Sequence, residues 1–232
     1  MYSAFSFGKI IKTILPGSIL AGTLFLIAEI LWLETRGTSL LATLIDQEAV
    51  AVAGAALVPV SLILGFLLNT IVWLHLNASV RSRVKAELAR TPFAELREAL
   101  CELIRRDVNG QMGGTRAELC KDTWPEPLSL EYYFLPAISV ERLSYLWESY
   151  FSWYEFHLNT LCALAMASAA VVATLLLRPP ASGVWTVIIC LALAAACGLL
   201  CRVLWKSAIR NMAAYERNLV LLIAGSINAA GR

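Results

Sequence analysis

The chain has 232 residues, of which 59% are hydrophobic and only 16% are charged, and its mean hydropathy is +0.68. Soluble domains contain about 45–50% apolar residues, so this composition predicts a protein whose solvent is largely lipid. The formal net charge of +2 is too small to indicate a nucleic-acid partner. The six cysteines include no CxxC pair, so their spacing predicts neither a disulfide framework nor a zinc site.

Four apolar segments are long enough to cross a bilayer, which takes about 20 apolar residues in a helix. We place them at about residues 13–33, 49–76, 158–177 and 184–205. The first follows a short basic start, as the core of a signal peptide would. It is longer than the usual core of about 7–15 residues, and no A-x-A-like cleavage site follows it, so we interpret it as a retained span.

These spans predict an all-α membrane protein with four transmembrane helices, helical cytosolic extensions and an insert. The expected domains are an N-terminal transmembrane hairpin (1–77), a cytosolic helical insert (78–157), a C-terminal transmembrane hairpin (158–205) and a cytosolic C-terminal helix (206–232). The insert is near the lower size limit for a core of its own. We therefore expect it to pack on extended ends of the membrane helices or on neighbouring subunits. The tail would lie on the inner membrane surface or against the insert.

Between the first two spans, residues 39–45 predict a small helix. The stretch from 138 to 177 predicts one long helix, which begins with aromatic and charged residues and becomes uncharged and apolar after His157. Such a change is typical of a helix that passes from water into lipid, with its aromatic rings at the interface. A ligand pocket built from these rings and Arg142 is the alternative to an interfacial belt.

The distribution of basic residues predicts the topology. All but two of the 19 Lys and Arg residues lie before the first span, between the second and third spans, or after the fourth. The exceptions are Arg36 and Arg178, one in each short loop. By the positive-inside rule, both termini and residues 78–157 are cytoplasmic, and we expect a multi-pass protein of a bacterial inner membrane.

Several polar residues within or beside the spans are candidate functional residues. Glu29 lies close to the outer interface, where a structural carboxylate and a proton or cation site are the alternatives. His75 and His157 stand at the cytosolic ends of spans; interfacial hydrogen bonding, pH sensing and metal binding with Glu148 or Glu155 are the alternatives. Asn69 and Asn159 are expected to bridge helices or, alternatively, to line a pore.

Small residues recur four positions apart in the spans, a pattern that lets helix backbones approach closely. They are Ser18 and Gly22; Ala165, Ala169 and Ala173; and Ala194 and Gly198. Packing within one subunit and packing between subunits are equally consistent with these stripes.

The chain contains no phosphate-binding loop and no GxSxG or HExxH motif, so we expect no enzyme, no cofactor and no resident metal. The leading hypothesis is an oligomeric inner-membrane protein that couples a cytosolic protein or small ligand, bound on residues 78–157, to the bilayer by pore gating or membrane perturbation. The alternatives are a membrane-anchored sensor or scaffold that recruits a cytosolic effector, and a membrane-embedded lipid-modifying enzyme.

In its layout of four spans and a modest cytosolic insert, the chain resembles the small membrane components of bacterial anti-phage defence systems, such as the membrane subunit of Kiwa. The resemblance covers the architecture and no particular residues. It implies that the sensor or scaffold alternative would act in antiviral defence.

Overall fold

The structure is a computed structural model that describes residues 7–46, 49–89, 91–112, 134, 138–177 and 183–230. Within these ranges the chain is almost entirely helical and has no strand. Four segments are long and apolar enough to cross a membrane: Ile11–Arg36, Val50–Leu88, Val140–Leu177 and Ile188–Ser226. The expected fold class, an all-α multi-pass membrane protein with four candidate spans, is therefore confirmed.

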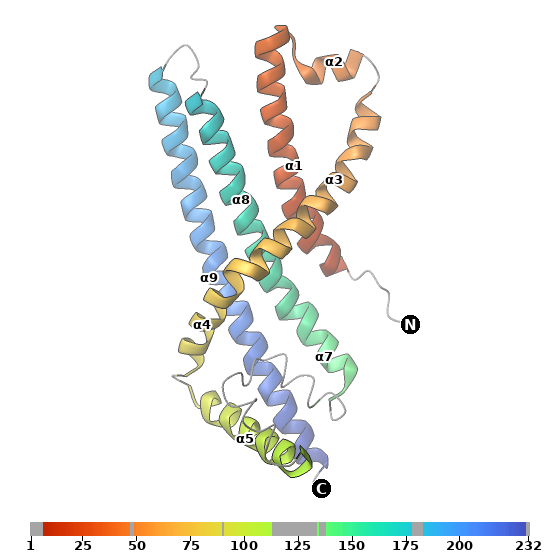
Figure 1. The fold of residues 1–232 in the computed structure, drawn as a ribbon, viewed down its shortest axis with the longest axis vertical. Helices are drawn as coiled ribbons and strands as arrows, with labels where there is room; N and C mark the ends of the chain where they lie inside the picture. Colours follow the sequence, from red (N-terminus) through yellow and green to blue (C-terminus); the bar gives the residue numbers. More distant parts are fainter. Residues whose placement is uncertain are drawn as a thin grey trace. The chain divides into compact units, whose positions relative to one another are not determined.

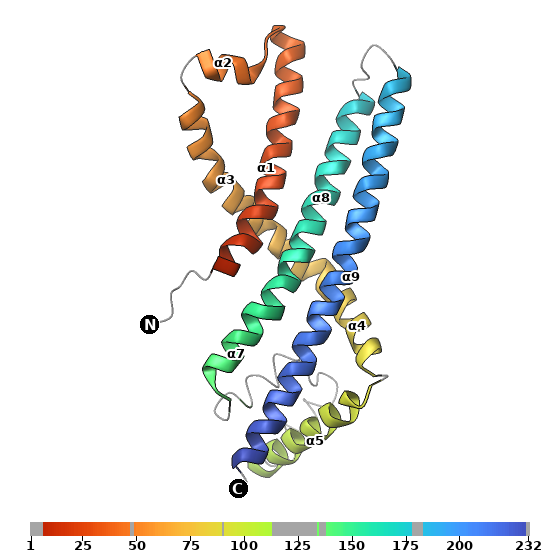
Figure 2. The ribbon, with the colours of Figure 1, turned by 180° about the vertical axis from the view of Figure 1, so that it is seen from behind.

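The helices follow one another with few breaks (Figures 1 and 2). In chain order they are α1 (Phe7–Arg36), α2 (Leu40–Asp46), α3 (Val50–Ile71), the π-helical turn η1 (Val72–Leu76), α4 (Asn77–Leu88), α5 (Phe93–Met112), α7 (Val140–Leu146), the π-helical turn η3 (Trp147–Phe151), α8 (Ser152–Leu177) and α9 (Gly183–Ala230). Helix α2 is the small helix expected over residues 39–45.

Two compact units make up the chain. The membrane unit contains Met1–Ser79 and Ser152–Ala208, and the insert unit contains Val80–Phe151 and Ile209–Arg232. The end of α9 thus belongs with the insert, which is one of the two arrangements expected for the tail. The insert obtains its core by packing against extensions of helices that also cross the membrane.

Helices α1 and α3 of the membrane unit cross at two glycines (Figure 1). A Cβ on Gly17 would collide with the backbone of Ser61, and a Cβ on Gly65 would collide with the backbone of Thr13. Ala21, one turn beyond Gly17, is also buried. Small side chains at this spacing allow the close backbone contact that stabilises helix pairs in lipid, where the hydrophobic effect does not drive helices together.

Hydroxyl side chains in the spans bond to their own helix. Ser18, Thr23 and Thr174 each donate to the carbonyl four residues earlier, at 2.7–2.8 Å. A polar group in hydrocarbon needs such a partner because no water is available. These residues therefore need not line an aqueous path.

The insert unit has an aromatic core between α4, η3 and α9. The rings of Phe151 and Tyr215 lie 5.3 Å apart between centroids, and both side chains are fully buried. Aliphatic side chains from α4 and α9 complete this core: Val80, Val84, Met212, Leu219 and Ile223. Helix α5 contributes Leu100 and Cys101, the buried face of its amphipathic pattern.

Candidate functional site

A buried ion pair joins α1 to α8 in the membrane unit. The ammonium group of Lys12 contacts Oε2 of Glu155, and Nε1 of Trp73 in η1 donates to Oε1 of Glu155 at 3.4 Å. Glu155 is only 5% exposed. Burial of a carboxylate is unfavourable unless donors replace its water, and the ammonium and indole groups are the donors here.

Two asparagines extend this cluster along the helices. Nδ2 of Asn159 lies 3.1 Å from the carbonyl oxygen of Lys12 and 3.3 Å from Oδ1 of Asn69. Asn159 is 1% exposed, and its Oδ1 has no partner within the part of the chain that the structure describes. Lys12, Asn69, Trp73, Glu155 and Asn159 together are called the polar junction below. It connects α1, the α3–η1 segment and α8 through side-chain contacts.

A second buried contact fixes α8 to the start of α4. The hydroxyl of Tyr154 donates to Oδ1 of Asn77 at 2.6 Å, and both residues are buried. Asn69, Trp73 and Asn77 are spaced four apart, as are Glu155 and Asn159. This spacing, which places residues on one helix side, is the sequence signal that could have identified Trp73 and Glu155 as partners of the two asparagines.

Two of the three helical segments that run from the membrane unit into the insert unit contain a π-helical turn close in sequence to residues of the polar junction. Trp73 belongs to η1, and η3 ends at Phe151, four residues before Glu155. A π-turn holds an extra residue, is rare within α-helices and occurs frequently at functional sites. Among the described residues, the polar junction therefore adjoins two places, η1 and η3, where the helix departs from regular α geometry.

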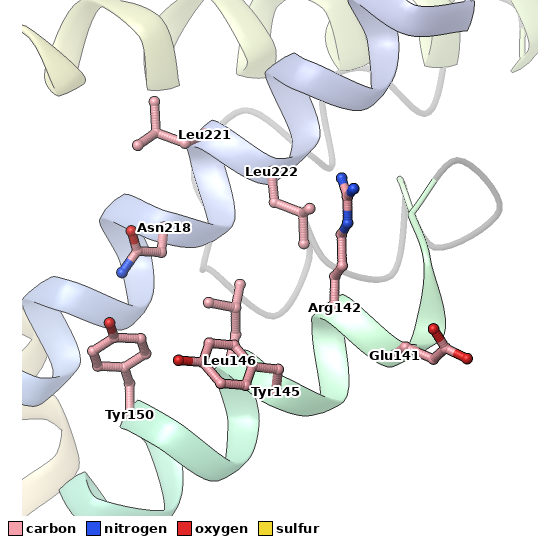
Figure 3. A pocket seen from close by; sticks show the side chains of 8 residues that line it. All are labelled: Glu141, Arg142, Tyr145, Leu146, Tyr150, Asn218, Leu221 and Leu222. Atoms are coloured by element: carbon pink, nitrogen blue, oxygen red, sulfur yellow. The ribbon is translucent and has the colours of Figure 1, made fainter.

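The insert unit contains a cavity of about 530 Å³ between the α7–η3 segment and α9 (Figure 3). Its lining residues are Glu141, Arg142, Tyr145, Leu146, Tyr150, Asn218, Leu221 and Leu222. In Figure 3 the guanidinium of Arg142 extends into the space between the two helices, and the hydroxyl of Tyr150 points towards Asn218. The carboxylate of Glu141 points away from that space. The cavity thus combines one cation and two phenols with an apolar wall.

A buried carboxylate lies elsewhere in the insert unit. Glu216 on α9 is 5% exposed, and its Oε2 is buried without a partner among the described residues. The positive charges of Arg97 on α5 and Arg81 on α4 act on it. Glu216 does not line the cavity.

The remaining candidate residues lie apart from the polar junction. Glu29 accepts a hydrogen bond from the backbone amide of Leu41 at 3.0 Å, at the start of α2. His75 is exposed in η1, whereas Nε2 of His157 lies 3.3 Å from the hydroxyl of Ser207 on α9. Within the described ranges no three His, Cys, Asp or Glu side chains are grouped so that they could hold a metal ion.

The small residues singled out in the sequence do not face their own chain. A Cβ on Gly22 or Gly198 would meet no atom within 4 Å, and Ala165, Ala169 and Ala173 are exposed. The close crossing instead uses Gly17 and Gly65, which the sequence stripes did not include. On α9, Cys197 and Cys201 approach the carbonyl oxygens of Leu164 and Leu161 at 3.6 and 4.0 Å, which brings α9 beside α8.

No family model matches the sequence, and neither a curated protein nor a solved structure is similar to it.

Proposed function

We propose that the protein is an oligomeric inner-membrane protein in which binding at a cytosolic insert unit alters the packing of the spans. The altered packing opens a pore or perturbs the bilayer. In this proposal the protein carries out no chemistry of its own, and the polar junction is the element that changes.

The observation that carries this proposal is the continuity of one helix. Residues Val140–Leu177 form a single helical segment that contains both Tyr150 of the cavity and Glu155 of the polar junction, only five residues apart. A ligand that prefers one position of Tyr150 must also bias the position of Glu155. Such a preference is all that a ligand needs to shift a conformational equilibrium.

The lengths of the helices support the same mechanism. The second, third and fourth candidate spans contain 39, 38 and 39 residues, or about 57–59 Å of helix each at about 1.5 Å per residue. The hydrocarbon layer is about 30 Å thick, so roughly half of each helix lies outside it. Three helical segments run from one unit into the other, and in this proposal they carry a change in the insert unit to the membrane unit.

The energetics of the polar junction suit a switch. Separating Lys12 from Glu155 leaves an unpaired charge in a poorly hydrated place, which costs about 3–5 kcal/mol for a fully buried pair. Moving an equilibrium from 1:99 to 99:1 takes about 5.5 kcal/mol. The binding energy of one small ligand or one protein contact is therefore of the right size to drive the change.

Small residues on exposed surfaces of two spans favour an oligomer. None of its most apolar stretch is buried within the chain, and Gly198 offers an open surface on it. The outward-facing alanines of α8 have the spacing of helix–helix contacts in membranes. A pore between copies would need less polar lining than a pathway through one bundle.

Leakage from liposomes tests the proposal. Purified protein is reconstituted into vesicles that hold a self-quenching dye, and wild type is compared with Glu155→Gln and Lys12→Met. Because each variant breaks the ion pair, we expect leakage to rise by about tenfold or more. Glu148→Gln, an exposed carboxylate on the same continuous helix, is the matched control and should behave as wild type.

A scaffold that recruits a cytosolic effector would give a different result. Its vesicles would stay sealed in every variant and with every ligand, while the insert unit would retain a protein partner in pull-down experiments. Tight vesicles for Glu155→Gln and Lys12→Met at normal reconstitution levels would therefore rule out the coupling mechanism.

A further inference from the structure

We propose that the cavity of the insert unit binds a small organic anion with a flat aromatic body. Arg142 holds the anionic group, and Tyr145 and Tyr150 hold the ring. The inference rests on the proposed function, since it assigns the chemical class of the ligand that acts at the insert unit.

Charge is the first reason. The guanidinium of Arg142 extends into the cavity and has no ion pair within the described residues (Figure 3). The carboxylate of its sequence neighbour Glu141, which also lines the cavity, points away from the space. A guanidinium presents its N–H groups as a planar fork that matches a carboxylate or phosphate, and it would repel a cationic ligand.

The aromatic residues supply the second reason. Tyr145 is 65% exposed, so its ring is accessible to a ligand. In a regular α-helix residues five apart diverge by about 140°, but the π-helical turn η3 adds a residue to the turn between Tyr145 and Tyr150. Both phenols consequently line one cavity. The extra residue of η3 therefore has a structural consequence for the binding surface.

The opposite wall sets the size and polarity of the ligand. Leu221 and Leu222 of α9 are apolar, and Asn218 adds one amide that can form a hydrogen bond with a polar edge of a ring. A volume of about 530 Å³ lies within the range of about 300–1,000 Å³ found for pockets that take drug-sized molecules. A bound ring would contact α7–η3 and α9 together, and both segments continue into the membrane unit.

Isothermal titration of the full-length protein in nanodiscs tests the proposal with four probes. AMP and indole-3-acetate are aromatic anions from two different chemical sources. Adenosine has the ring without the charge, and inorganic phosphate has the charge without the ring. We expect AMP or indole-3-acetate to bind at least about tenfold more tightly than adenosine and phosphate do. Which of the two aromatic anions binds distinguishes a nucleotide from an aryl carboxylate.

Variants test the role of each residue. Arg142→Ala should weaken the binding of the aromatic anion by about tenfold or more, and Arg142→Lys should have an intermediate effect because the charge stays while the fork is lost. Glu148→Gln removes an exposed carboxylate of η3 that does not line the cavity, so it is the matched control and should leave the affinity unchanged. Leu222→Trp, which fills the cavity, should block binding of the probe while thermal unfolding shows that the protein remains folded.

Three results would overturn the proposal. They are the absence of binding by both aromatic anions up to about 1 mM, binding of the preferred aromatic anion no tighter than that of adenosine, and equal affinities of Arg142→Ala and Glu148→Gln for that anion. If a probe binds but vesicle leakage does not change, the proposed coupling is wrong and the proposed binding site still holds. If Glu155→Gln vesicles leak but no probe binds, the proposed coupling still holds and the proposed ligand class is wrong.

Discussion

Lys12 and Glu155 are 143 positions apart in the sequence and form an ion pair inside the membrane unit. One residue lies near the start of the first span, and the other lies in the first turn of α8. The indole of Trp73 donates to the same carboxylate, so three helices meet at one charged group. The pairing is sensitive to rotation of α8, because a turn of the helix would carry Glu155 away from both donors.

Removing either member of this pair should destabilise the fold, and the two losses should not add. We expect Lys12→Met and Glu155→Gln each to lower the free energy of unfolding by about 2–3 kcal/mol, less than for a fully buried pair because Lys12 is partly exposed. The double variant should lose about 1–2 kcal/mol less than the sum. Thermal unfolding in nanodiscs measures all three variants. Strictly additive losses would show that the two groups do not interact.

The crossing of α1 and α3 predicts opposite effects for two neighbouring glycine substitutions. Gly17→Ala should destabilise the protein by about 1–3 kcal/mol, because the new methyl group meets the rigid backbone of Ser61. Gly22→Ala has open space and should be neutral or stabilise the helix by up to about 1 kcal/mol. Unfolding of both variants under identical detergent conditions gives the comparison. Equal effects at the two positions would contradict the observed crossing.

The outward alanines of α8 predict a packing surface between copies. Replacing Ala165 and Ala169 together by leucine should lower the oligomer mass, since bulky side chains keep backbones apart. Met166→Leu is an exposed, volume-conserving change in the same helix and should leave the mass unchanged. Native mass spectrometry from nanodiscs measures the masses. A wild-type protein that is monomeric at all concentrations would refute the oligomer.

Charge asymmetry predicts the side of the membrane on which the C-terminal end of α9 lies. We expect a green fluorescent protein fused after residue 232 to fluoresce and an alkaline phosphatase fused at the same place to be inactive, because the flanking arginines and lysines retain that end in the cytoplasm. The reverse pattern would place the insert on the non-cytoplasmic side of the membrane and would refute the proposal of a cytosolic ligand.

The sequence was informative about elements because each element depends on local composition. About 20 apolar residues must form a helix in lipid, since only internal hydrogen bonds satisfy the backbone there. The short helix α2 follows from Ser39, whose Oγ accepts a hydrogen bond from the amide of Ala42 in its first turn. Gly37 ends α1 with a positive φ of 70°, as glycine after a helix commonly does.

The sequence was less informative about which small residues pack inside the chain. The stripes of Ser18 with Gly22 and of Ala194 with Gly198 have the right spacing for close packing. The crossing nevertheless uses Gly65 and Gly17. Gly17 lies one residue before Ser18 of the first stripe. A four-residue spacing identifies a helix face, but neighbouring residues on a helix differ by about 100°, so the spacing does not say which face meets a partner.

The sequence by itself determined that this is a helical membrane protein with four candidate spans and with basic residues concentrated at one side. Composition is enough for this, because transfer from water into lipid favours apolar residues and disfavours charged ones. Only the tertiary structure decided that Lys12, Trp73 and Glu155 share one buried cluster and that Tyr145 and Tyr150 line one cavity with α9. Those relationships depend on the crossing of helices far apart in the chain and on an extra residue in a π-turn. The four-residue spacing of Trp73 and Glu155 from the two asparagines marks one side of each helix. It does not say which distant helix that side contacts, because the packing of whole helices decides that.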